Sequence, residues 1–367
     1  MKKIKVIISG GGTGGHIYPA IAIANAVKAK RPDAEILFIG AEGKMEMEKV
    51  PQAGYKIIGL PIAGLQRRLT LKNLKVPFLL LKSLNKAKKI IKDFRPDVAV
   101  GVGGYASGPT LKTAEKLNIP TVLQEQNSYP GITNKLLAKK ANIICVAYDN
   151  MERFFPKDKI LLTGNPVRQD ILNLSHKRNE ALAYFNLKNE LQTVLVIGGS
   201  LGARTINQVI EKMLPYFKEN NIQLIWQTGK YYAEKAKQAV NEINAETIIT
   251  MPFISRMDYA YAAANIVISR AGALSVSEIA VAKKPAIFIP SPNVAEDHQT
   301  KNAMALVNHH AAIMVKDDEA QAKLKNELDN LLNDKNLQNE LIKNITPLGK
   351  PNAADDIANE ILKLADR

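Results

Sequence analysis

The stretch KVIISGGGTGGHIYPAIA, residues 5–22, decides the fold of this chain. It begins with an apolar run of strand type, passes through five glycines in the six positions 10–15, and continues with the spacing of a helix. A buried strand that turns through glycines into a helix opens a nucleotide-binding type of α/β domain. A second opening of this kind lies at residues 193–203, where TVLVI precedes GGSLGA. Two openings predict two doubly wound α/β domains, each with a parallel sheet.

Further apolar runs that end in small residues alternate with helical patterns in both halves of the chain. They lie at residues 35–39, 98–102, 121–124 and 143–146, and again at 223–227, 247–251, 266–269 and 286–289. We therefore expect a first domain over residues 1–163, joined by a C-terminal helix within 351–367, and a second domain over 164–350. The two Rossmann-like domains would face each other across a cleft lined by the glycine-rich loops.

Length and composition also describe a two-domain globular protein. The chain has 367 residues, 46% of them hydrophobic, and no apolar run near the roughly 18 residues that a membrane-spanning helix needs. Its single cysteine, Cys145, cannot form an intrachain disulfide and fits a reducing compartment. Residues 1–160 carry 27 Lys and Arg against 12 Asp and Glu, whereas the rest carry 23 of each, so the whole net charge of +15 lies in the first half. This asymmetry predicts an anionic partner for the first domain.

Three glycine-rich loops follow predicted strands: GGGTGGH (10–16), GVGGYASGP (101–109) and GGSLGA (198–203). Glycines in such loops let backbone amides approach phosphate groups at the start of a helix. Gly10, Gly12 and Gly15 also match the dinucleotide pattern, with Glu42 as the carboxylate for the ribose, and this allows a nicotinamide-dependent oxidoreductase. Three loops indicate instead several phosphates or two phosphorylated ligands.

Seven motifs occur in the order of one enzyme family. They are GGGTGGH (10–16), GGYASGP (103–109), QEQN (124–127), GNPVR (164–168), GGSLGA (198–203), RAGALSVSEI (270–279) and EDHQTKNA (296–303). Over this part the chain resembles the MurG family of peptidoglycan N-acetylglucosaminyltransferases. The resemblance implies the GT-B fold and transfer of GlcNAc from UDP-GlcNAc to the 4-hydroxyl of the MurNAc unit of undecaprenyl-pyrophosphoryl-MurNAc-pentapeptide (lipid I), without cofactor or metal. It also implies a peripheral protein on the cytoplasmic face of the cell membrane, with cell-wall synthesis proteins among its partners.

The resemblance assigns residues to the site motif by motif. Residues that would bind the donor are Thr13, Gly14, Gly15, Asn127, Arg168, Ser200, Ile254, Ala273, Leu274, Ser275, Val276, Ser277, Glu278 and Gln299. Residues of the loops that would face acceptor or phosphate are Gly11, Gly12, Gly103, Gly104 and Tyr105. In the family's pattern the backbone of Ile254 would bind the uracil, and Gln299 would contact the transferred sugar. The stretches 128–130 and 291–295 depart from the common wording of the family.

The chemistry of the second domain's motif agrees with such a transfer. Ser275 is placed to cap a helix, and Glu278 follows three residues later, which is the pattern of a capping box. Amides at that helix start, together with Arg168, would stabilise the departing UDP, while Glu278 would accept from ribose hydroxyls. The sequence contains no Asp-x-Asp pair of the kind that clamps a metal.

An inverting transfer also needs a base that takes the proton of the acceptor hydroxyl. His16, directly after the glycines, is the first candidate, although it could instead bond to its helix start. Glu125 is the second candidate, with an ion pair as its alternative role, and His298 is a weaker third.

A basic segment, residues 65–95, holds ten Lys and Arg against one acid. At helical spacing one face would carry the core residues Leu80, Leu84, Ala87, Ile91 and Phe94. Beside it, a second apolar strip would consist of Leu74, Phe78 and Leu81, bordered by Lys75, Lys82 and Lys89. Apolar side chains ringed by lysines suit an anionic membrane surface. The alternative is a wide core face with a solvated basic back, because Pro77 can interrupt the helix.

Other functions compete with this interpretation. Another GT-B transferase with a different acceptor, or a UDP-sugar epimerase, would share the donor motifs. The oxidoreductase would use the first glycine loop but leave RAGALSVSEI (270–279) unexplained. A nucleic-acid-binding module would explain the charge, but the basic segment has no interleaved tyrosine or tryptophan, so we expect no nucleic-acid partner.

Overall fold

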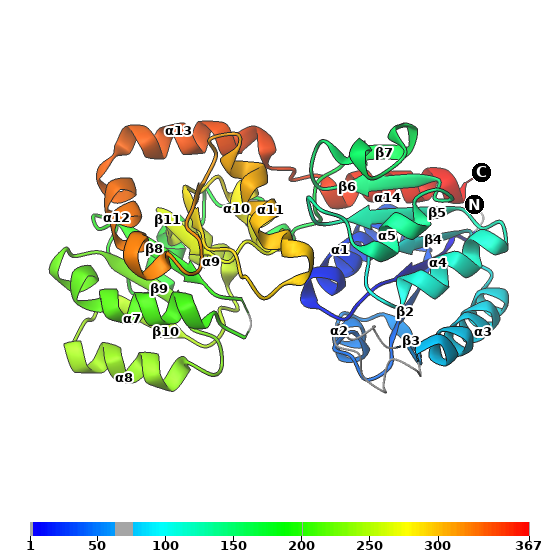
Figure 1. The fold of residues 1–367 in the computed structure, drawn as a ribbon, viewed down its shortest axis with the longest axis horizontal. Helices are drawn as coiled ribbons and strands as arrows, with labels where there is room; N and C mark the ends of the chain where they lie inside the picture. Colours follow the sequence, from blue (N-terminus) through cyan, green and yellow to red (C-terminus); the bar gives the residue numbers. More distant parts are fainter. Residues whose placement is uncertain (1–2, 63–75, 200, 367) are drawn as a thin grey trace. The chain divides into compact units, whose positions relative to one another are not determined.

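A computed structural model of the chain describes residues 3–62, 76–199 and 201–366. The chain divides into two compact units, the first made of Met1–Val167 with Pro351–Arg367 and the second of Arg168–Lys350. Each unit holds one parallel sheet with helices packed on it (Figure 1). The predicted fold of two doubly wound α/β domains is confirmed. The expected boundary after residue 163 lies slightly ahead of the division observed after Val167.

The first sheet has seven strands in the order β3-β2-β1-β4-β5-β6-β7, and all pairs are parallel. The strands are β1 (Lys5–Ser9), β2 (Glu35–Ala41), β3 (Lys56–Leu60), β4 (Val98–Gly101), β5 (Thr121–Glu125), β6 (Ile143–Val146) and β7 (Ile160–Leu162). The helices are α1 (Gly14–Lys30), α2 (Glu46–Gln52), α3 (Val76–Phe94), α4 (Ser107–Lys116), α5 (Ile132–Leu137) and α14 (Ala353–Ala365). The strand order reverses between β1 and β4, and sheets of this type bind ligands beyond the carboxyl ends of such a strand pair.

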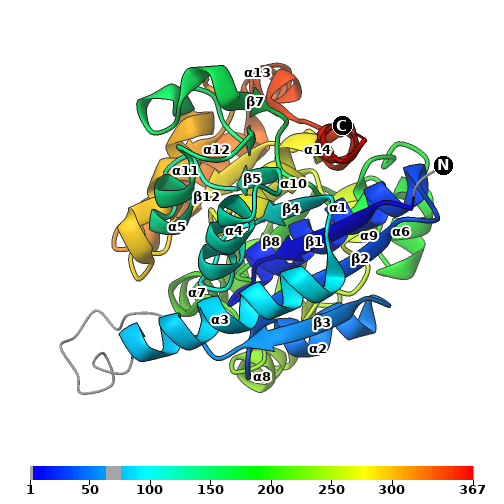
Figure 2. The ribbon, with the colours of Figure 1, turned by 90° about the vertical axis from the view of Figure 1, so that its right-hand side faces the viewer.

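Alternate residues of β1 build the core on the two faces of this sheet. Val6 and Ile8 join the apolar cluster under α1 and α14, to which α14 contributes Ile357 and Ile361. Ile7 joins the cluster on the other face, under α3 and α4 (Figure 2). The last helix of the chain therefore completes the core of the first unit.

The second sheet has six strands in the order β10-β9-β8-β11-β12-β13, again all parallel. The strands are β8 (Thr193–Ile197), β9 (Gln223–Gln227), β10 (Ile248–Met251), β11 (Ile266–Ser269), β12 (Ala286–Phe288) and β13 (Ile313–Met314). The helices are α6 (Arg178–Tyr184), α7 (Arg204–Glu219), α8 (Ala233–Ile243), α9 (Met257–Ala263), α10 (Ala273–Ala282), α11 (His298–Val307), α12 (Ala320–Asn333) and α13 (Lys335–Ile345). Here the strand order reverses between β8 and β11, and the loop after β8 and the start of α10 follow these two strands.

The strands that the sequence analysis missed are β3, β7 and β13. All three lie at an edge of their sheet. Edge strands are short or partly exposed, so they lack the continuous apolar run that marks a buried parallel strand.

Candidate active site

The first glycine-rich loop joins β1 to α1 and places His16 in the first turn of that helix. Thr13 precedes α1 in an extended conformation, and Gly11 and Gly12 have φ values of +149° and +87°, which other residues rarely adopt. The Nδ1 atom of His16 lies 3.0 Å from the carbonyl oxygen of Gly11 and 3.3 Å from Thr13 Oγ1. Because a carbonyl oxygen only accepts, Nδ1 carries the proton in the first contact, and Nε2 then carries the lone pair that a base needs.

The second glycine-rich loop follows β4 and packs directly against the first. A Cβ atom on Gly104, which has a φ of +85°, would lie 2.4 Å from the carbonyl oxygen of Gly11. A Cβ atom on Gly103 would lie 2.9 Å from Cδ2 and Nε2 of His16. Only glycine allows this approach, so the structure brings Gly11, His16, Gly103 and Gly104 together. Tyr105, beside them, is an exposed ring.

Glu125 ends β5, and its buried carboxylate is surrounded by donors from the loop that follows. Oε1 accepts from the backbone amide of Asn127 at 3.0 Å and from its side chain at 3.3 Å. Oε2 accepts from Asn134 Nδ2 at 2.9 Å and from the amide of Gly131 at 3.1 Å. Burial raises the pKa of this carboxyl above its ordinary value, and the donated hydrogen bonds oppose the rise. Glu125 therefore holds residues 127–134 in place.

Sequence reasoning missed Glu46, a second buried carboxylate of the first unit. It lies on α2, is 1% exposed, and accepts from the backbone amides of Gly12 at 2.9 Å and Ala41 at 3.0 Å. The only trace of Glu46 in the sequence is a pair of glycines, Gly11 and Gly40, which lie against its side chain from two sides. A Cβ atom there would lie 2.2 Å from Glu46 Oε1 and 2.6 Å from its Cγ, respectively.

Glu42, which the oxidoreductase alternative assigns to the ribose, points elsewhere. Its carboxylate pairs with Lys86 Nζ of α3 at 2.8 Å, and both side chains are largely exposed. An exposed ion pair of this kind contributes little to stability, and Glu42 is a surface residue.

In the second unit the loop GGSLGA (198–203) joins β8 to α7 and packs against the end of β9. A Cβ atom on Gly202, which has a φ of +81°, would lie 2.2 Å from the carbonyl oxygen of Thr228. Gln227 supports the same loop by donating from Nε2 to the carbonyl oxygen of Gly199 at 2.9 Å. The expected donor residue Ser200 lies outside the described residues.

The prediction that Ser275 and Glu278 form a capping box at the start of α10 is wrong. Gly272 occupies the N-cap position, with φ −64° and ψ 146°, and has no side chain with which to cap. Ser275 lies within the first turn, after Ala273 and Leu274, where its hydroxyl is too late in the helix to cap it. The positive end of the α10 dipole lies at this start, and helix starts are sites where proteins bind anions.

Glu278, on the buried side of α10, contacts two residues of other elements. Its Oε1 accepts from Arg168 Nε at 2.9 Å, and its Oε2 accepts from the hydroxyl of Tyr261 at 3.2 Å. Burial raises the pKa of the Glu278 carboxyl above its ordinary value, and the Arg168 guanidinium opposes that rise. The Arg168 side chain is 38% exposed, so its guanidinium reaches the surface while it is held by Glu278. Tyr261, on α9, is a fully buried partner that no motif had indicated.

Two further expected donor residues, Ile254 and Gln299, lie in the second unit. Ile254 lies in the loop between β10 and α9 and is buried. Gln299, in the first turn of α11, accepts through Oε1 from the backbone amide of Ser291 at 2.9 Å. That contact ties Gln299 to the 291–295 stretch that departs from the family wording.

The exposed face of α3 carries apolar side chains. Phe78 and Leu81 are 69% and 62% exposed. Leu80, which was expected in the core, is 41% exposed, and the buried residues of this helix are Ser83, Ala87, Ile90 and Ile91. Within the described part of the chain α3 runs from Val76 to Phe94 and continues past Pro77 without a break. Lys82 is exposed beside these residues, and Leu74 and Lys75 lie outside the described residues.

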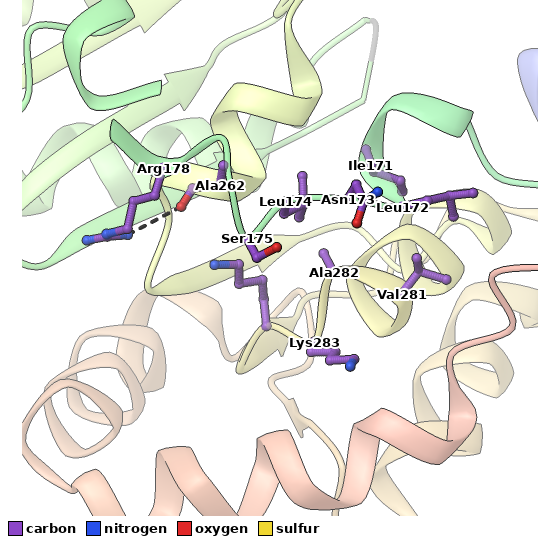
Figure 3. Close-up of a pocket in the computed structure, with 11 residues that line it drawn as sticks. Ile171, Leu172, Asn173, Leu174, Ser175, Arg178, Ala262, Val281, Ala282 and Lys283 are labelled. Carbon is purple, nitrogen blue, oxygen red and sulfur yellow. Dashed lines mark hydrogen bonds between the residues drawn. The ribbon is translucent and has the colours of Figure 1, made fainter. Parts of the chain in front are cut away.

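A cavity of about 430 Å³ lies at the carboxyl end of α10, away from the predicted donor-binding residues 273–278 (Figure 3). Its lining includes Leu172, Ala262, Val281, Arg178 and Lys284, and none of the predicted site residues. Arg178 donates to the carbonyl oxygens of Ala262 and Ala263, and Lys284 to that of Ala264, so both cations bond to the carboxyl end of α9. The cavity thus belongs to the packing of α9 and α10.

Among the residues that the structure describes, no group of three or more His, Cys, Asp and Glu is arranged to hold a metal ion. No helix within the described ranges is both long enough and apolar enough to cross a membrane.

Comparison with known proteins defines the class. The models "Glycosyltransferase family 28 N-terminal domain" and "Glycosyltransferase family 28 C-terminal domain" match residues 6–146 and 193–361. The crystal structure of MurG from Acinetobacter baumannii is 30% identical, covers 98% of this chain and 99% of its own, and gives a TM-score of 0.79. The UDP-GlcNAc 2-epimerase of Neisseria meningitidis shares the fold with a TM-score of 0.69 at 13% identity, covering 99% of this chain and 100% of its own. The matched models define a glycosyltransferase of family 28.

Two curated relatives narrow the class to one family. A protein of Flavobacterium psychrophilum is 59% identical over 366 residues, which cover 100% of this chain and 99% of the relative. A protein of Bacteroides thetaiotaomicron is 58% identical over 367 residues, with coverage of 100% and 99%. Both are named "UDP-N-acetylglucosamine--N-acetylmuramyl-(pentapeptide) pyrophosphoryl-undecaprenol N-acetylglucosamine transferase". The chain belongs to this MurG family of N-acetylglucosaminyltransferases, which leaves the oxidoreductase and epimerase alternatives without support.

Proposed function

We propose that this chain transfers GlcNAc from UDP-GlcNAc to the 4-hydroxyl of the MurNAc unit of lipid I, with inversion at the anomeric carbon. The observation that carries the choice of substrates is 59% identity, over the full length, with a transferase whose name states both of them.

The base in this proposal is His16. The oxygen of the acceptor hydroxyl attacks C1 of GlcNAc from the side opposite the diphosphate, and the bond from C1 to the phosphate oxygen breaks. The electron pair of that bond leaves with UDP, and the hydroxyl proton passes to Nε2 of His16. The contact of Nδ1 with the Gly11 carbonyl at 3.0 Å supports this role, because it leaves the acceptor nitrogen on the other side of the ring.

Glu125 takes a supporting role in the proposal. Its two oxygens already accept four hydrogen bonds from residues 127–134, which include the expected donor residue Asn127. A buried carboxylate engaged in this way is a weaker base candidate than His16, and it positions the loop instead.

The second unit binds the donor in this proposal. The start of α10, residues 273–275, faces the diphosphate, and the helix dipole stabilises the charge that develops on the leaving UDP. Arg168 adds a cation there, and Glu278 both orients Arg168 and accepts from the ribose. Ile254, Ser277 and Gln299 complete the donor site that the family resemblance implies.

A membrane-facing surface on α3 and α5 brings the protein to its lipid-linked acceptor, at the cytoplasmic face. Phe78 and Leu81 on α3 and Ile132 and Leu136 on α5, which are 74% and 75% exposed, are apolar side chains in contact with water. These helices flank α4 in Figure 2. The lysines that accompany them are Lys82, Lys88 and Lys89 on α3 and Lys135, Lys139 and Lys140 in and after α5. Exposed apolar side chains among lysines fit an anionic bilayer surface.

Transfer of radiolabel from UDP-GlcNAc to lipid I tests the function and the base together. The wild-type chain should form lipid-linked product, and His16→Ala should lower kcat by about 10² to 10⁴-fold while the Kd for UDP stays unchanged. His176→Ala, which removes an exposed histidine of the second unit, is the matched control and should behave as wild type. Absence of transfer by the wild type would refute the function, and a His16→Ala enzyme of normal turnover would refute the base.

A further inference from the structure

One peptide unit of the first glycine loop joins a buried carboxylate to the imidazole of His16. Its carbonyl oxygen, on Gly11, lies 3.0 Å from His16 Nδ1. Its amide, on Gly12, donates to Glu46 Oε2 at 2.9 Å. The carboxylate, the peptide and the imidazole therefore form one chain of hydrogen bonds.

Glu46 is built into this position. It is 1% exposed, and its other oxygen accepts from the amide of Ala41 at 3.0 Å, so both oxygens act as acceptors, as a carboxylate does. The glycines at positions 11 and 40 lie so close to it that a Cβ atom on either would clash with the Glu46 side chain. The first glycine loop and β2 thus enclose the Glu46 carboxylate and leave its side chain room for one conformation.

A charged acceptor bonded to the N–H of a peptide changes how strongly the C=O of the same peptide accepts a hydrogen bond. An ionised carboxylate makes a stronger hydrogen bond to the Gly12 amide than a neutral acceptor would, and this bond draws electron density toward the Gly11 carbonyl oxygen. That oxygen becomes a better acceptor for the Nδ1 proton. The same arrangement also stabilises the positive imidazolium that forms when Nε2 takes up a proton, as the carboxylate next to a catalytic histidine does in a serine-protease triad.

We propose that Glu46 is a positioning residue that acts on His16 through the Gly11–Gly12 peptide, holding the ring in the tautomer with the proton on Nδ1. The consequence for turnover rests on the proposed role of His16 as base. The consequence for the tautomer does not, because it concerns the free enzyme.

The first measurement needs no variant. Nitrogen NMR of the imidazole at alkaline pH, where the ring is neutral, should show His16 of the wild-type chain mainly as the Nδ1–H tautomer, with His16→Ala used to assign the signal. A His16 ring that carries its proton mainly on Nε2 would overturn the inference.

The second measurement uses Glu46→Gln, which keeps the shape but removes the charge and one acceptor. We expect the Nε2–H form of His16 to increase and kcat to fall by on the order of tenfold, less than for loss of the base itself, with the Kd for UDP unchanged. Glu42→Gln is the matched control, because it removes a carboxylate four residues earlier that pairs with Lys86 on the surface. Circular dichroism and UDP binding establish that the variants are folded.

The outcomes separate this inference from the proposed function. If Glu46→Gln is folded and leaves both the tautomer and kcat as in wild type, Glu46 has no such role. If Glu46→Gln shifts the tautomer while His16→Ala retains turnover, the link to His16 stands and the assignment of His16 as base is wrong.

Discussion

Among single residues, Glu278 has two roles: it positions Arg168 and, in the proposed donor site, it accepts from the ribose. Its carboxylate holds Arg168 at 2.9 Å and accepts from Tyr261 at 3.2 Å, although burial disfavours its charge. A buried carboxylate kept between a cation and a hydroxyl has a fixed direction. In the proposed donor site this fixes where Arg168 meets the diphosphate and where the ribose hydroxyls find an acceptor.

Substitution of Glu278 therefore tests which task dominates. Glu278→Ala should weaken the binding of UDP and of uridine by a similar factor, on the order of tenfold, because both ligands contain the ribose. Arg168→Ala should weaken UDP more than uridine, because only UDP carries the diphosphate. Isothermal calorimetry with both ligands measures the two ratios.

Glu278→Gln serves as the control for packing, since it keeps the volume and can still accept from Arg168. It should bind uridine more tightly than Glu278→Ala does. Unchanged uridine affinity in Glu278→Ala, together with weaker UDP binding, would mean that Glu278 acts only through Arg168.

At the level of elements, α3 has one buried and one exposed apolar face. Its buried face is narrow and contains Ser83 and Ala87, so the large side chains at 78, 80 and 81 have no core to join. The helix thus keeps exposed apolar area that a purely solvated helix would not need. Its exposed lysines give the same face a positive charge.

The double change Phe78→Ser and Leu81→Ser should leave folding and UDP binding intact and reduce binding to phosphatidylglycerol vesicles. Each lysine near such a surface contributes about 1 kcal/mol, so the residual binding should be strongly salt-dependent. Cosedimentation with vesicles at low and high salt measures both effects.

Tyr231→Ser is the control for this experiment, because it removes a side chain of the second unit that is also highly exposed. It should bind vesicles as the wild type does. Unchanged vesicle binding of the folded double variant would place the membrane contact on another surface.

At the level of the whole molecule, the chain's last helix packs into the unit in which the chain begins. α14 contributes Ile357 and Ile361 to the core under β1 and α1, whereas the second unit ends at Lys350. The stability of the first unit therefore depends on a helix that follows the second unit along the chain. The second unit has its own core, built on β8 and its neighbours.

Ile361→Ala should accordingly destabilise the first unit by about 2–5 kcal/mol, through a cavity in its core. Scanning calorimetry should show one transition lowered, while UDP still binds to and stabilises the second unit. Asn359→Ala, at an exposed position of the same helix, should leave both transitions unchanged. Loss of UDP binding in Ile361→Ala at a temperature where the second unit is folded would contradict the independence of the two cores.

Local patterns in the sequence were sufficient for the central strands, the two glycine-rich openings and the final helix. Runs such as 143–146 and 193–197 are buried strands because every side chain in them is apolar or small, and the structure has them with the same bounds. Glycine runs after such strands likewise indicate a backbone with positive φ, a conformation that other residues rarely adopt. The order of the motifs was enough to indicate the family.

Tertiary structure alone decided which side chains meet. Glu46 and Gly12 are 34 residues apart in sequence, and Arg168 and Glu278 are 110 apart. The local pattern around Ser275 predicted a cap, but the helix begins two residues before it, and helical spacing alone placed Leu80 in the core. A buried carboxylate takes its partners from whichever segments the sheet order brings beside it, and the exposure of a helix face depends on what covers it. Neither is encoded in the few residues on either side, because both follow from packing between distant parts of the chain.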